Sequence, residues 1–273
     1  MKKYLDILEK VYKKGDERDD RTGVGTRAYF GIQTRYDMED GFPAVTTKKL
    51  FFDVVKAELL WFIKGSRDIK ELHKMKCHIW DGNAKAPYWK EKAEFEGDVG
   101  RIYGVQWRDW RNAEGESVDQ LNDLIEGIKK KPYGRRHIVT AWNPGELGKM
   151  ALPPCHAFFQ LFVAGDKLSL QMYQRSCDMF LGVPFNIASY SLFLHMLAQV
   201  TGYIPGEFIH VLGDAHIYKN HYSQVEEQLK RDPYPLPTLK LNKEIKNIDD
   251  FKMEDIVLEN YNHHPSIKAD MAV

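Results

Sequence analysis

Two strand-like runs joined by a two-residue turn constrain the fold of this chain most strongly. The first run follows a pair of prolines and opens at Cys155, the turn is formed by Gly165 and Asp166, and the second run ends near Arg175. Glycine and aspartate between two apolar runs are typical of a tight hairpin. The pattern therefore predicts a long β-hairpin that returns Arg175 towards Cys155.

The remaining segments mix helical and strand-like patterns. Helical spacing or length predicts helices at residues 2–14, 51–63, 186–202 and 216–230, and residues 117–120 fit a capping box that opens a helix to about residue 131. Strand-like patterns occupy residues 26–36, 137–142, 208–212 and 253–259. Because helices and strands do not alternate regularly, we expect an α+β fold. It would be a single domain over residues 1–273, with a large mixed, mainly antiparallel sheet flanked by helices.

The charge balance and the cysteines limit the class of protein. There are 39 Lys and Arg residues against 39 Asp and Glu, so the formal net charge is +0. This balance argues against a primary nucleic-acid partner and against an anionic membrane surface. The three cysteines form no disulfide framework, and no apolar run approaches the ~20 residues that cross a bilayer. The first residues lack the apolar run of a signal peptide, and we expect a cytoplasmic protein with no membrane role.

Cys155 is the candidate nucleophile. A lone cysteine is more often a small buried hydrophobe. Here, the preceding prolines fix the backbone, His156 is adjacent, and the predicted hairpin brings Arg175 close. A cysteine near a fixed positive charge can act as a nucleophile at neutral pH. These residues favour a functional thiol without yet naming a reaction.

Four arginines could bind one phosphate dianion. Arg21 lies in a glycine-containing loop before a strand, Arg135 and Arg136 precede another strand, and Arg175 is followed by Ser176. The planar guanidinium donates two parallel hydrogen bonds to phosphate. Taken alone, such arginines are more often solvated surface.

Three further side chains are candidates for chemistry. Glu58 interrupts a strongly apolar run, and burial would raise its pKa towards the range useful in proton transfer. The alternative is that it faces water. His216 and Tyr218 alternate on a predicted extended segment and could bind a sugar hydroxyl, although a turn with incidental polar residues is equally compatible. Neighbours such as His263 and His264 cannot readily close on one ion, so we expect no metal site.

Taken together, these segments closely resemble the thymidylate synthase family. The resemblance runs nearly from end to end, at residues 21–23, 60–62, 78–81, 103–107, 135–136, 152–156, 173–176, 178, 181–190, 213–218, 264–265 and 271–273. The Cys-His block and the block from Gln174 to Tyr190 are highly specific in combination. After Trp80 and Asp81 some members carry tryptophan where this chain has Asn83, which implies an adjusted folate contact.

The resemblance implies reductive methylation of 2′-deoxyuridine 5′-monophosphate (dUMP) to thymidylate (dTMP). The carbon and hydride donor would be the cosubstrate 5,10-methylenetetrahydrofolate, which leaves as dihydrofolate. It also implies a homodimer packed through the large sheet, with Arg135 and Arg136 contributed across the interface. Cys155 would add to C6 of the base. An ordinary thiol with a pKa of about 8.5 is roughly 3% ionised at pH 7. Arg175 is expected to lower the pKa of Cys155, and a fall of about two units would make most of the thiol ionised.

The resemblance also assigns roles to single residues. The implied catalytic residues are Cys155, Glu58, Tyr103, His156, Arg175, Asp178 and Asn186. The implied substrate-binding residues are Arg21, Arg135, Arg136, Gln174, Arg175, Ser176, Asp178, Asn186, His216 and Tyr218. The implied folate-binding residues are Lys48, Ile79, Trp80, Asn83, Asp178, Leu181, Gly182, Phe185, Ala272 and Val273.

The chemistry of several roles can be stated. Tyr103 would help remove the C5 proton, while Glu58 and His156 would organise water. The amide of Asn186 would donate to O4 and accept from N3–H of uracil, a pattern that cytosine reverses. That discrimination requires neighbours that fix the orientation of the amide.

Three other functions compete. A dUMP hydroxymethylase on the same scaffold would let water capture the methylene group in place of hydride. An RNA-binding protein would use the arginines, which the balanced charge disfavours. A Cys-His hydrolase would need a partner to orient His156, and adjacent residues on a strand point apart.

Overall fold

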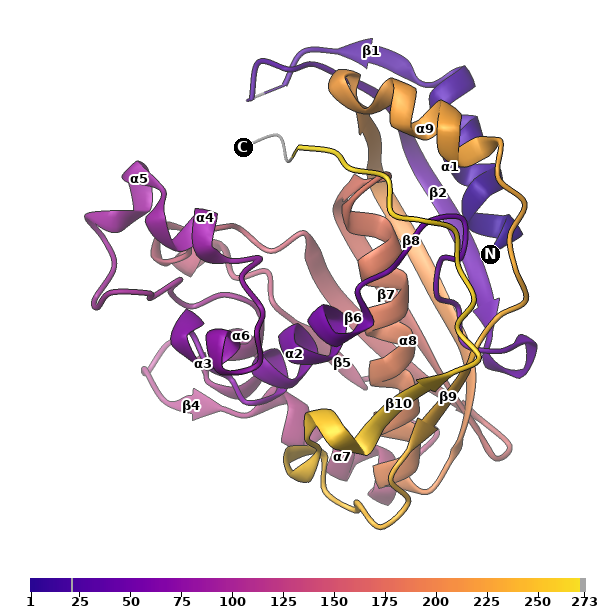
Figure 1. Ribbon diagram of the computed structural model, residues 1–273. Coiled ribbons are helices and arrows are strands. Elements are labelled where there is room, and N and C mark those ends of the chain that lie inside the picture. Colours follow the sequence, from indigo (N-terminus) through magenta and orange to yellow (C-terminus); the bar gives the residue numbers. More distant parts are fainter. Residues whose placement is uncertain (21, 271–273) are drawn as a thin grey trace.

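A six-stranded mixed sheet organises the molecule. The computed structural model describes residues 1–20 and 22–270 (Figure 1). The strands of the sheet are β1 (Asp16–Arg18), β2 (Thr26–Asp37), β5 (Ile138–Thr140), β6 (His156–Ala164), β7 (Lys167–Asp178) and β8 (Ile204–Tyr218). Their order is β1-β2-β8-β7-β6-β5, and every neighbouring pair is antiparallel except β7 with β8. The predicted α+β fold with a mixed, mainly antiparallel sheet is confirmed.

The β6–β7 hairpin forms at the predicted turn. Gly165 has φ 59, a left-handed conformation that glycine adopts readily. Pairing runs from Ala164 opposite Lys167 back to His156 opposite Gln174. Along β6 buried and exposed side chains largely alternate, as expected for a strand with one face in the core. The hairpin therefore carries the start of β6 and the end of β7 to the same place.

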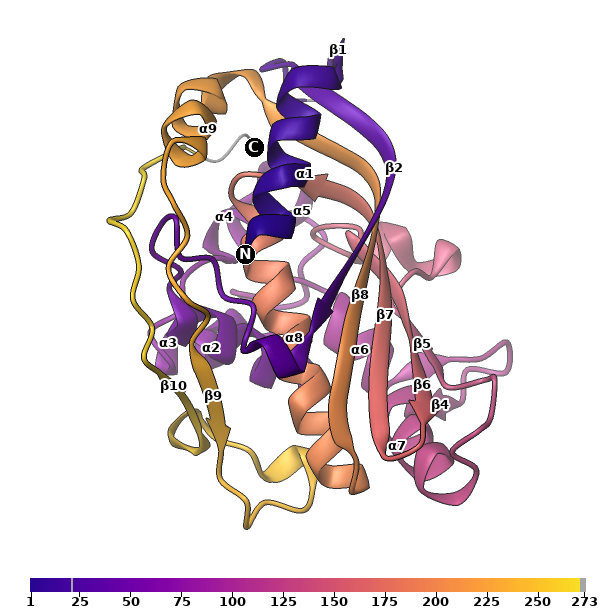
Figure 2. The same cartoon turned by 90° about the vertical axis from the view of Figure 1, so that its right-hand side faces the viewer.

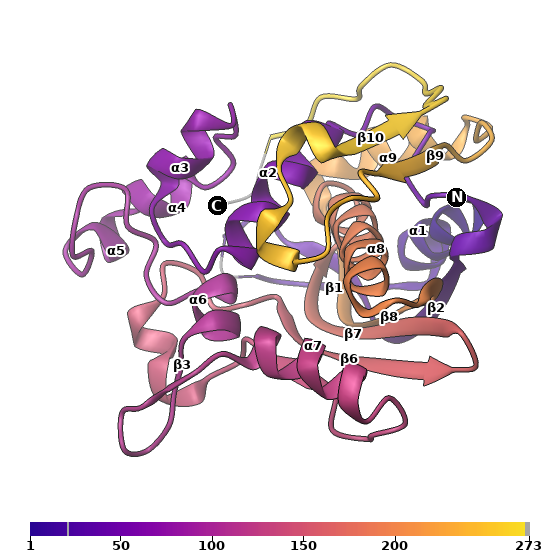
Figure 3. The same ribbon diagram turned by 90° about the horizontal axis from the view of Figure 1, so that it is seen from below.

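The helix α8 (Gly182–Thr201) forms the centre of the core. Most of its side chains are buried, which suits a helix that is apolar on all sides. It packs against β7 and β8, and α2 (Phe52–Ile63) packs against it in turn. Figure 3 shows α8 lying over these two strands. Other helices around the core are α1 (Lys2–Lys14), α6 (Tyr103–Arg108), α7 (Gln120–Lys130) and α9 (Tyr222–Leu229).

The outer side of the β5–β6 edge carries exposed apolar groups. Phe158 is 38% exposed, Phe162 66% and Ile138 45%, and Gln160 pairs with Ile138 on the same side. The neighbours of these residues, such as Phe159 and Leu161, are buried in the core. The viewpoint of Figure 2 shows the long strands β2, β8 and β7 beside the helical layer. No segment among residues 1–20 and 22–270 therefore covers this face of the sheet at the β5–β6 edge.

The smaller elements differ most from the sequence-based expectations. The following short helices and strands were not predicted as such: α3 (Ile69–Lys74), α4 (Asp81–Lys85), α5 (Pro87–Lys90), β3 (Trp110–Arg111), β4 (Ser117–Val118) and β9 (Thr238–Leu241). Helix α6 is likewise additional. The 3-10 turns are η1 (Met38–Asp40), η2 (Pro144–Lys149), η3 (Lys219–His221), η4 (Ile248–Asp250) and η5 (Met253–Asp255). The last predicted strand is shorter than expected, as β10 (Ile256–Glu259).

Two boundaries need correction. The helix predicted from residue 117 begins at Gln120, because Asp119 is its N-cap and accepts a hydrogen bond from the Asn122 backbone N–H, while Ser117 lies in β4. The helix predicted from residue 216 begins at Tyr222, because the preceding residues extend β8 between two partner strands. In the described part of the chain, no helix is long and apolar enough to span a bilayer.

Candidate active site

The candidate residues gather where β6 begins, β7 and β8 end, and α8 begins. In the register of the sheet, His156 is opposite Gln174, and Asp178 is opposite His216. Helix α8 begins at Gly182, only a short turn after β7. Figure 1 shows α4 and α5 on one side of this end of the sheet and α1 and α9 on the other. Segments distant in the sequence therefore meet at one end of the sheet.

Arg175 fixes the backbone that carries Cys155. Its Nε donates to the carbonyl of Pro154 and one terminal nitrogen donates to that of Pro153, both at 2.8 Å. The backbone N–H of Arg175 donates to the Cys155 carbonyl at 2.9 Å. On the other side, the Cys155 N–H donates to the Tyr103 hydroxyl at 2.7 Å. Because the backbone N–H and C=O of Cys155 are both hydrogen-bonded, the backbone from which its half-buried side chain extends is held in place.

The pKa of Cys155 differs from the expectation. Burial raises the pKa of the thiol above its ordinary value and outweighs the lowering by the charge of Arg175 and by hydrogen bonds from Tyr103 and Ser176. Asp178 adds a smaller rise. The predicted lowering by the charge of Arg175 is present, but the predicted net fall of the thiol pKa is wrong. A thiol with a raised pKa keeps its proton at neutral pH.

Glu58 is held by Trp80. The indole Nε1 donates to Glu58 Oε1 at 2.8 Å, which excludes the simple interpretation of a carboxylate pointing to water. Burial raises the pKa of Glu58 to about 7, and the Trp80 hydrogen bond opposes that rise. An aromatic wall continues beside it, with Phe62 stacked on Tyr103 at 4.8 Å between ring centroids and Trp80 at 6.1 Å from Tyr103. A carboxyl group that titrates near neutrality can both accept and donate a proton.

His156 is buried among aromatic rings. It is 7% exposed, with its ring centroid 5.0 Å from that of Tyr103 and 5.2 Å from that of Tyr190. Burial lowers the pKa of His156 to about 4, opposed by a hydrogen bond with Asn186. Within the described residues, His156 Nδ1 has no hydrogen-bond partner. The ring is thus neutral at physiological pH.

A chain of hydrogen bonds orients Asn186. Gln174 Nε2 donates to the backbone carbonyl of Ser176 at 3.0 Å and to Asn186 Oδ1 at 2.9 Å. Gln174 Oε1 faces His210 Nε2 at 2.8 Å, so that ring nitrogen is the donor. A backbone carbonyl can only accept, and this fixes the direction of the whole chain. The amide of Asn186 therefore presents Nδ2 away from Gln174, which supplies the required orientation.

His210 was not among the sequence-based candidates. It is fully buried in β8, and burial lowers its pKa to about 3, so its ring is neutral. Its signal in the sequence was a single histidine within an apolar run. The pairing of β7 with β8 sets His210 opposite Met172, two residues before Gln174, and from there its ring reaches the Gln174 side chain.

Asp178 and Lys48 shape the entry to α8. Asp178 Oδ1 accepts from the backbone N–H groups of Phe180 and Leu181 at 3.0 and 3.1 Å. Lys48 is 7% exposed, and its ammonium donates to the Phe180 carbonyl and lies over the Phe180 ring. Burial lowers the pKa of Lys48 to about 7. Lys48 thus supports this turn, and its implied role in folate binding stays a prediction.

His216 and Tyr218 lie on an extended strand, as expected. They occupy the end of β8, with ring centroids 5.2 Å apart, and Tyr218 pairs with Thr26 at the start of β2. Burial alone would lower the pKa of His216, but Asp214, at 3.2 Å from Nδ1, and the charge of Asp178 raise it overall. The loop before β2 therefore ends beside these two rings.

Some predicted residues lie apart from this cluster or outside the described residues. Arg135 and Arg136 are exposed in the loop before β5. Ile79 is 38% exposed, and Asn83 is partly buried in α4. Leu181 and Phe185 pack partly buried against the core, and Gly182 opens α8. The predictions for Arg21, Ala272 and Val273 fall outside the described residues.

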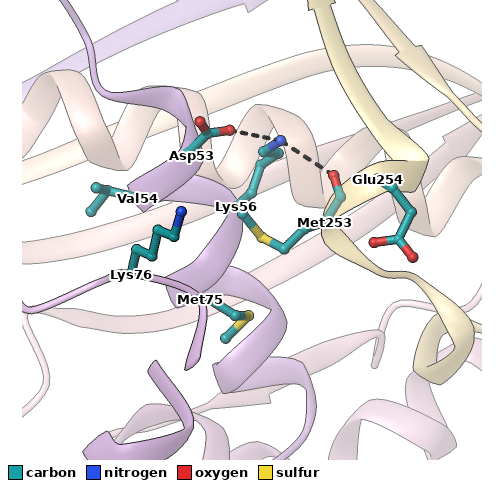
Figure 4. A pocket seen from close by; sticks show the side chains of 7 residues that line it. All are labelled: Asp53, Val54, Lys56, Met75, Lys76, Met253 and Glu254. Atoms are coloured by element: carbon teal, nitrogen blue, oxygen red, sulfur yellow. Dashed lines mark hydrogen bonds and ion pairs between the residues drawn. The ribbon is translucent and has the colours of Figure 1, made fainter. Parts of the chain in front are cut away.

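A surface groove of about 520 Å³ lies elsewhere, between α2, the turn after α3 and η5. Figure 4 shows Lys56 reaching across it from Asp53 to the carbonyl of Met253, at 2.8 and 3.2 Å. None of the predicted site residues that the structure describes belongs to its lining. The groove lies between peripheral segments and is separate from the cluster around Cys155.

One comparison with known proteins bears on the whole chain. A family model described as thymidylate synthase matches residues 2–273. The match covers every element that contributes to the cluster, from the loop before β2 to the end of β8.

Proposed function

The chain belongs to the thymidylate synthase family, a family of methyltransferases, and we propose that it converts dUMP to dTMP with 5,10-methylenetetrahydrofolate as cosubstrate. The observation that carries this proposal is the fixed position of Cys155, held by Arg175 and Tyr103 at the mouth of the hairpin. A restrained thiol facing a partly apolar wall suits covalent addition to a pyrimidine.

Cys155 acts as the nucleophile. Its sulfur adds to C6 of uracil, and C5 gains the electron density that lets it bond to the incoming one-carbon unit. The thiol proton must leave during this addition, since burial keeps it on the sulfur beforehand. Tyr103, whose hydroxyl accepts a hydrogen bond from the Cys155 backbone N–H, would help to remove the C5 proton later. Glu58, with a pKa of about 7, exchanges protons through water.

Asn186 reads the base. With Oδ1 fixed by Gln174, the amide accepts from uracil N3–H through its remaining lone pair and donates Nδ2–H to O4. Cytosine would place a lone pair at N3 and an amino group at C4 in place of O4, and would leave both contacts mismatched. Unpaired polar groups of this kind give strong discrimination.

A second copy of the chain completes the phosphate site. Ser176 and Arg175 lie at the cluster, whereas Arg135 and Arg136 are exposed in the loop before β5. The exposed apolar side chains Phe158 and Phe162 on the same edge favour burial against an identical face. A homodimer would then supply both arginines to the partner's nucleotide.

The alternative product outcome is hydroxymethylation, in which water captures the methylene group. The rings of Phe62, Trp80 and Tyr103 give the site an apolar wall, which supports hydride transfer over capture of the methylene group by water. The rise in absorbance as dihydrofolate forms separates the two. Product formation without that rise would mean hydroxymethylation.

The covalent step has a direct test. The protein is incubated with 5-fluoro-dUMP and methylenetetrahydrofolate, and the intact mass is measured. Fluorine at C5 blocks proton removal, so the adduct should persist on Cys155 and map to its peptide. Cys155→Ala should gain no mass, whereas Cys177→Ala, which changes a fully buried neighbouring thiol, should still form the adduct. Absence of the adduct in the unaltered protein refutes the proposal.

A further inference from the structure

Two histidines and one aspartate converge at the junction of α3 and α4. His73 lies near the end of α3, Asp81 is the first residue of α4, and His78 lies in the turn between them. His73 Nε2 is 2.7 Å from Asp81 Oδ1, and His78 Nδ1 is 3.4 Å from Asp81 Oδ2. The ligand atoms all lie within 4.8 Å of one another. Neither histidine belongs to the cluster around Cys155 by any role assigned above.

The backbone and the rings preorganise this arrangement. Lys76 has φ 57, and this left-handed residue turns the chain back so that His78 meets the end of α3. The imidazoles of His73 and His78 stack at 4.5 Å between centroids with 29° between their planes. Each carboxylate oxygen of Asp81 consequently faces a different ring nitrogen. Small rotations of the three side chains are enough to surround one atom.

We propose that His73, His78 and Asp81 form a binding site for a divalent transition-metal ion of the zinc, nickel or copper type. Such ions bind imidazole nitrogen and carboxylate oxygen at about 2.0–2.2 Å, so two ligand atoms of one ion lie about 3–4 Å apart. The 3.4 Å between His78 Nδ1 and Asp81 Oδ2 matches this spacing, and the 2.7 Å between His73 Nε2 and Asp81 Oδ1 has only to lengthen by a few tenths of an ångström. Two nitrogen donors disfavour magnesium and calcium, which prefer oxygen.

The site is open on its outer side. The side chain of His78 is 63% exposed, that of His73 34% and that of Asp81 28%, so water can fill the remaining coordination positions. Cys77, beside His78, is fully buried and lies on the core side of the turn. The ion is therefore bound by nitrogen and oxygen without a thiolate.

The position of the site gives it a structural consequence. Trp80, which immediately precedes Asp81, donates to Glu58 at 2.8 Å. An ion that joins the end of α3 to the start of α4 restrains the turn that carries this indole. Binding to the folded state alone raises thermal stability by mass action. Binding and stabilisation do not depend on the function proposed for Cys155.

Zinc and cobalt titrations of the full chain, prepared without a histidine tag, test the proposal. Zinc is titrated in competition with a chromophoric chelator, and thermal unfolding is followed with and without the ion. We expect one site per chain and a rise in melting temperature that the chelator reverses. The visible spectrum of bound cobalt should lack the charge-transfer band of a thiolate ligand.

Matched variants identify the ligands. His78→Gln and Asp81→Asn should weaken zinc binding about tenfold or more and abolish the ion-dependent rise in melting temperature. Because His78 is largely exposed, His78→Gln should keep the melting temperature of the ion-free protein. His263→Gln, at another histidine pair, should bind zinc as the unaltered protein does. Equal binding by His78→Gln, no binding by the unaltered protein, or a thiolate band with cobalt would each overturn the proposal.

Discussion

Replacement of Glu58 by glutamine should remove a pH-dependent loss of stability. Burial raises the pKa of Glu58 from its ordinary 4.5 to about 7 in the folded protein. A carboxyl group whose folded pKa lies above its unfolded value favours folding below the unfolded pKa, and this contribution is lost as pH rises through the folded pKa. The relevant window therefore runs from about pH 4.5 to above pH 7.

The size of the effect follows from the two pKa values. Each tenfold difference in proton affinity corresponds to about 1.4 kcal/mol, so ionising Glu58 above pH 7 costs the folded state about 3 kcal/mol. Glutamine has the same shape, and its carbonyl oxygen can still accept from Trp80 Nε1. Any constant cost of burying its amide group shifts stability equally at every pH. The difference in stability between Glu58→Gln and the unaltered protein should change by about 3 kcal/mol across the window, in favour of the variant at high pH.

Urea unfolding at a series of pH values, at one protein concentration, measures this difference. Glu146→Gln is the matched control. Burial alone would raise the pKa of Glu146, but its hydrogen bonds with Arg101 and Gln106 outweigh burial and hold that pKa below its usual range. That variant should lose stability at neutral pH and approach the unaltered protein as pH falls. If the curves for Glu58→Gln and the unaltered protein stay parallel between pH 4.5 and 8, the reasoning about Glu58 is wrong.

Three more predictions concern the proposed reaction. Asn186→Asp should raise turnover of dCMP relative to dUMP in competition assays, since a protonated carboxyl can present the reversed pattern to cytosine; an unchanged ratio removes Asn186 from base reading. Gln174→Leu should free the Asn186 amide to flip and reduce the preference for dUMP about tenfold, the value of one hydrogen bond of about 1.5 kcal/mol, measured as the ratio of kcat/KM values. Co-refolded Cys155→Ala and Arg136→Ala chains, each inactive alone, should regain part of the activity because a mixed dimer contains one intact site, and no recovery would contradict sharing of Arg136.

Local patterns predicted the long elements well. The β6–β7 hairpin depends on alternating apolar and polar residues and on a glycine turn. Helix α8 depends on a long apolar run that ends at a glycine, so both elements could be predicted from neighbouring residues. The end of β8 was ambiguous in the sequence, because residues 216–218 fit both an extended segment and the start of a helix. They are held extended by pairing with β2 on one side and β7 on the other. Short helices such as α4 depend on packing more than on amphipathic spacing.

The sequence predicted which residues form the site better than it predicted their burial, pKa values and hydrogen-bond partners. The restraint of Cys155 by Arg175 matched the expected hairpin, but the degree of burial that raises the thiol pKa is a property of the assembled core. The place of His210 behind Gln174 depended on strand register, which single-sequence patterns do not determine. The convergence of His73 with Asp81 required the left-handed turn at Lys76.

The sheet order has a consequence for synthesis of the chain on the ribosome. Strand β2 emerges early, yet its long partner is β8, and until β8 leaves the exit tunnel β2 can pair only with the three residues of β1. Pairing between distant segments is slow and leaves strand edges open to other chains. Nascent chains that stop before residue 204 should therefore hold an unfinished sheet in which one edge of β2 is open to other chains.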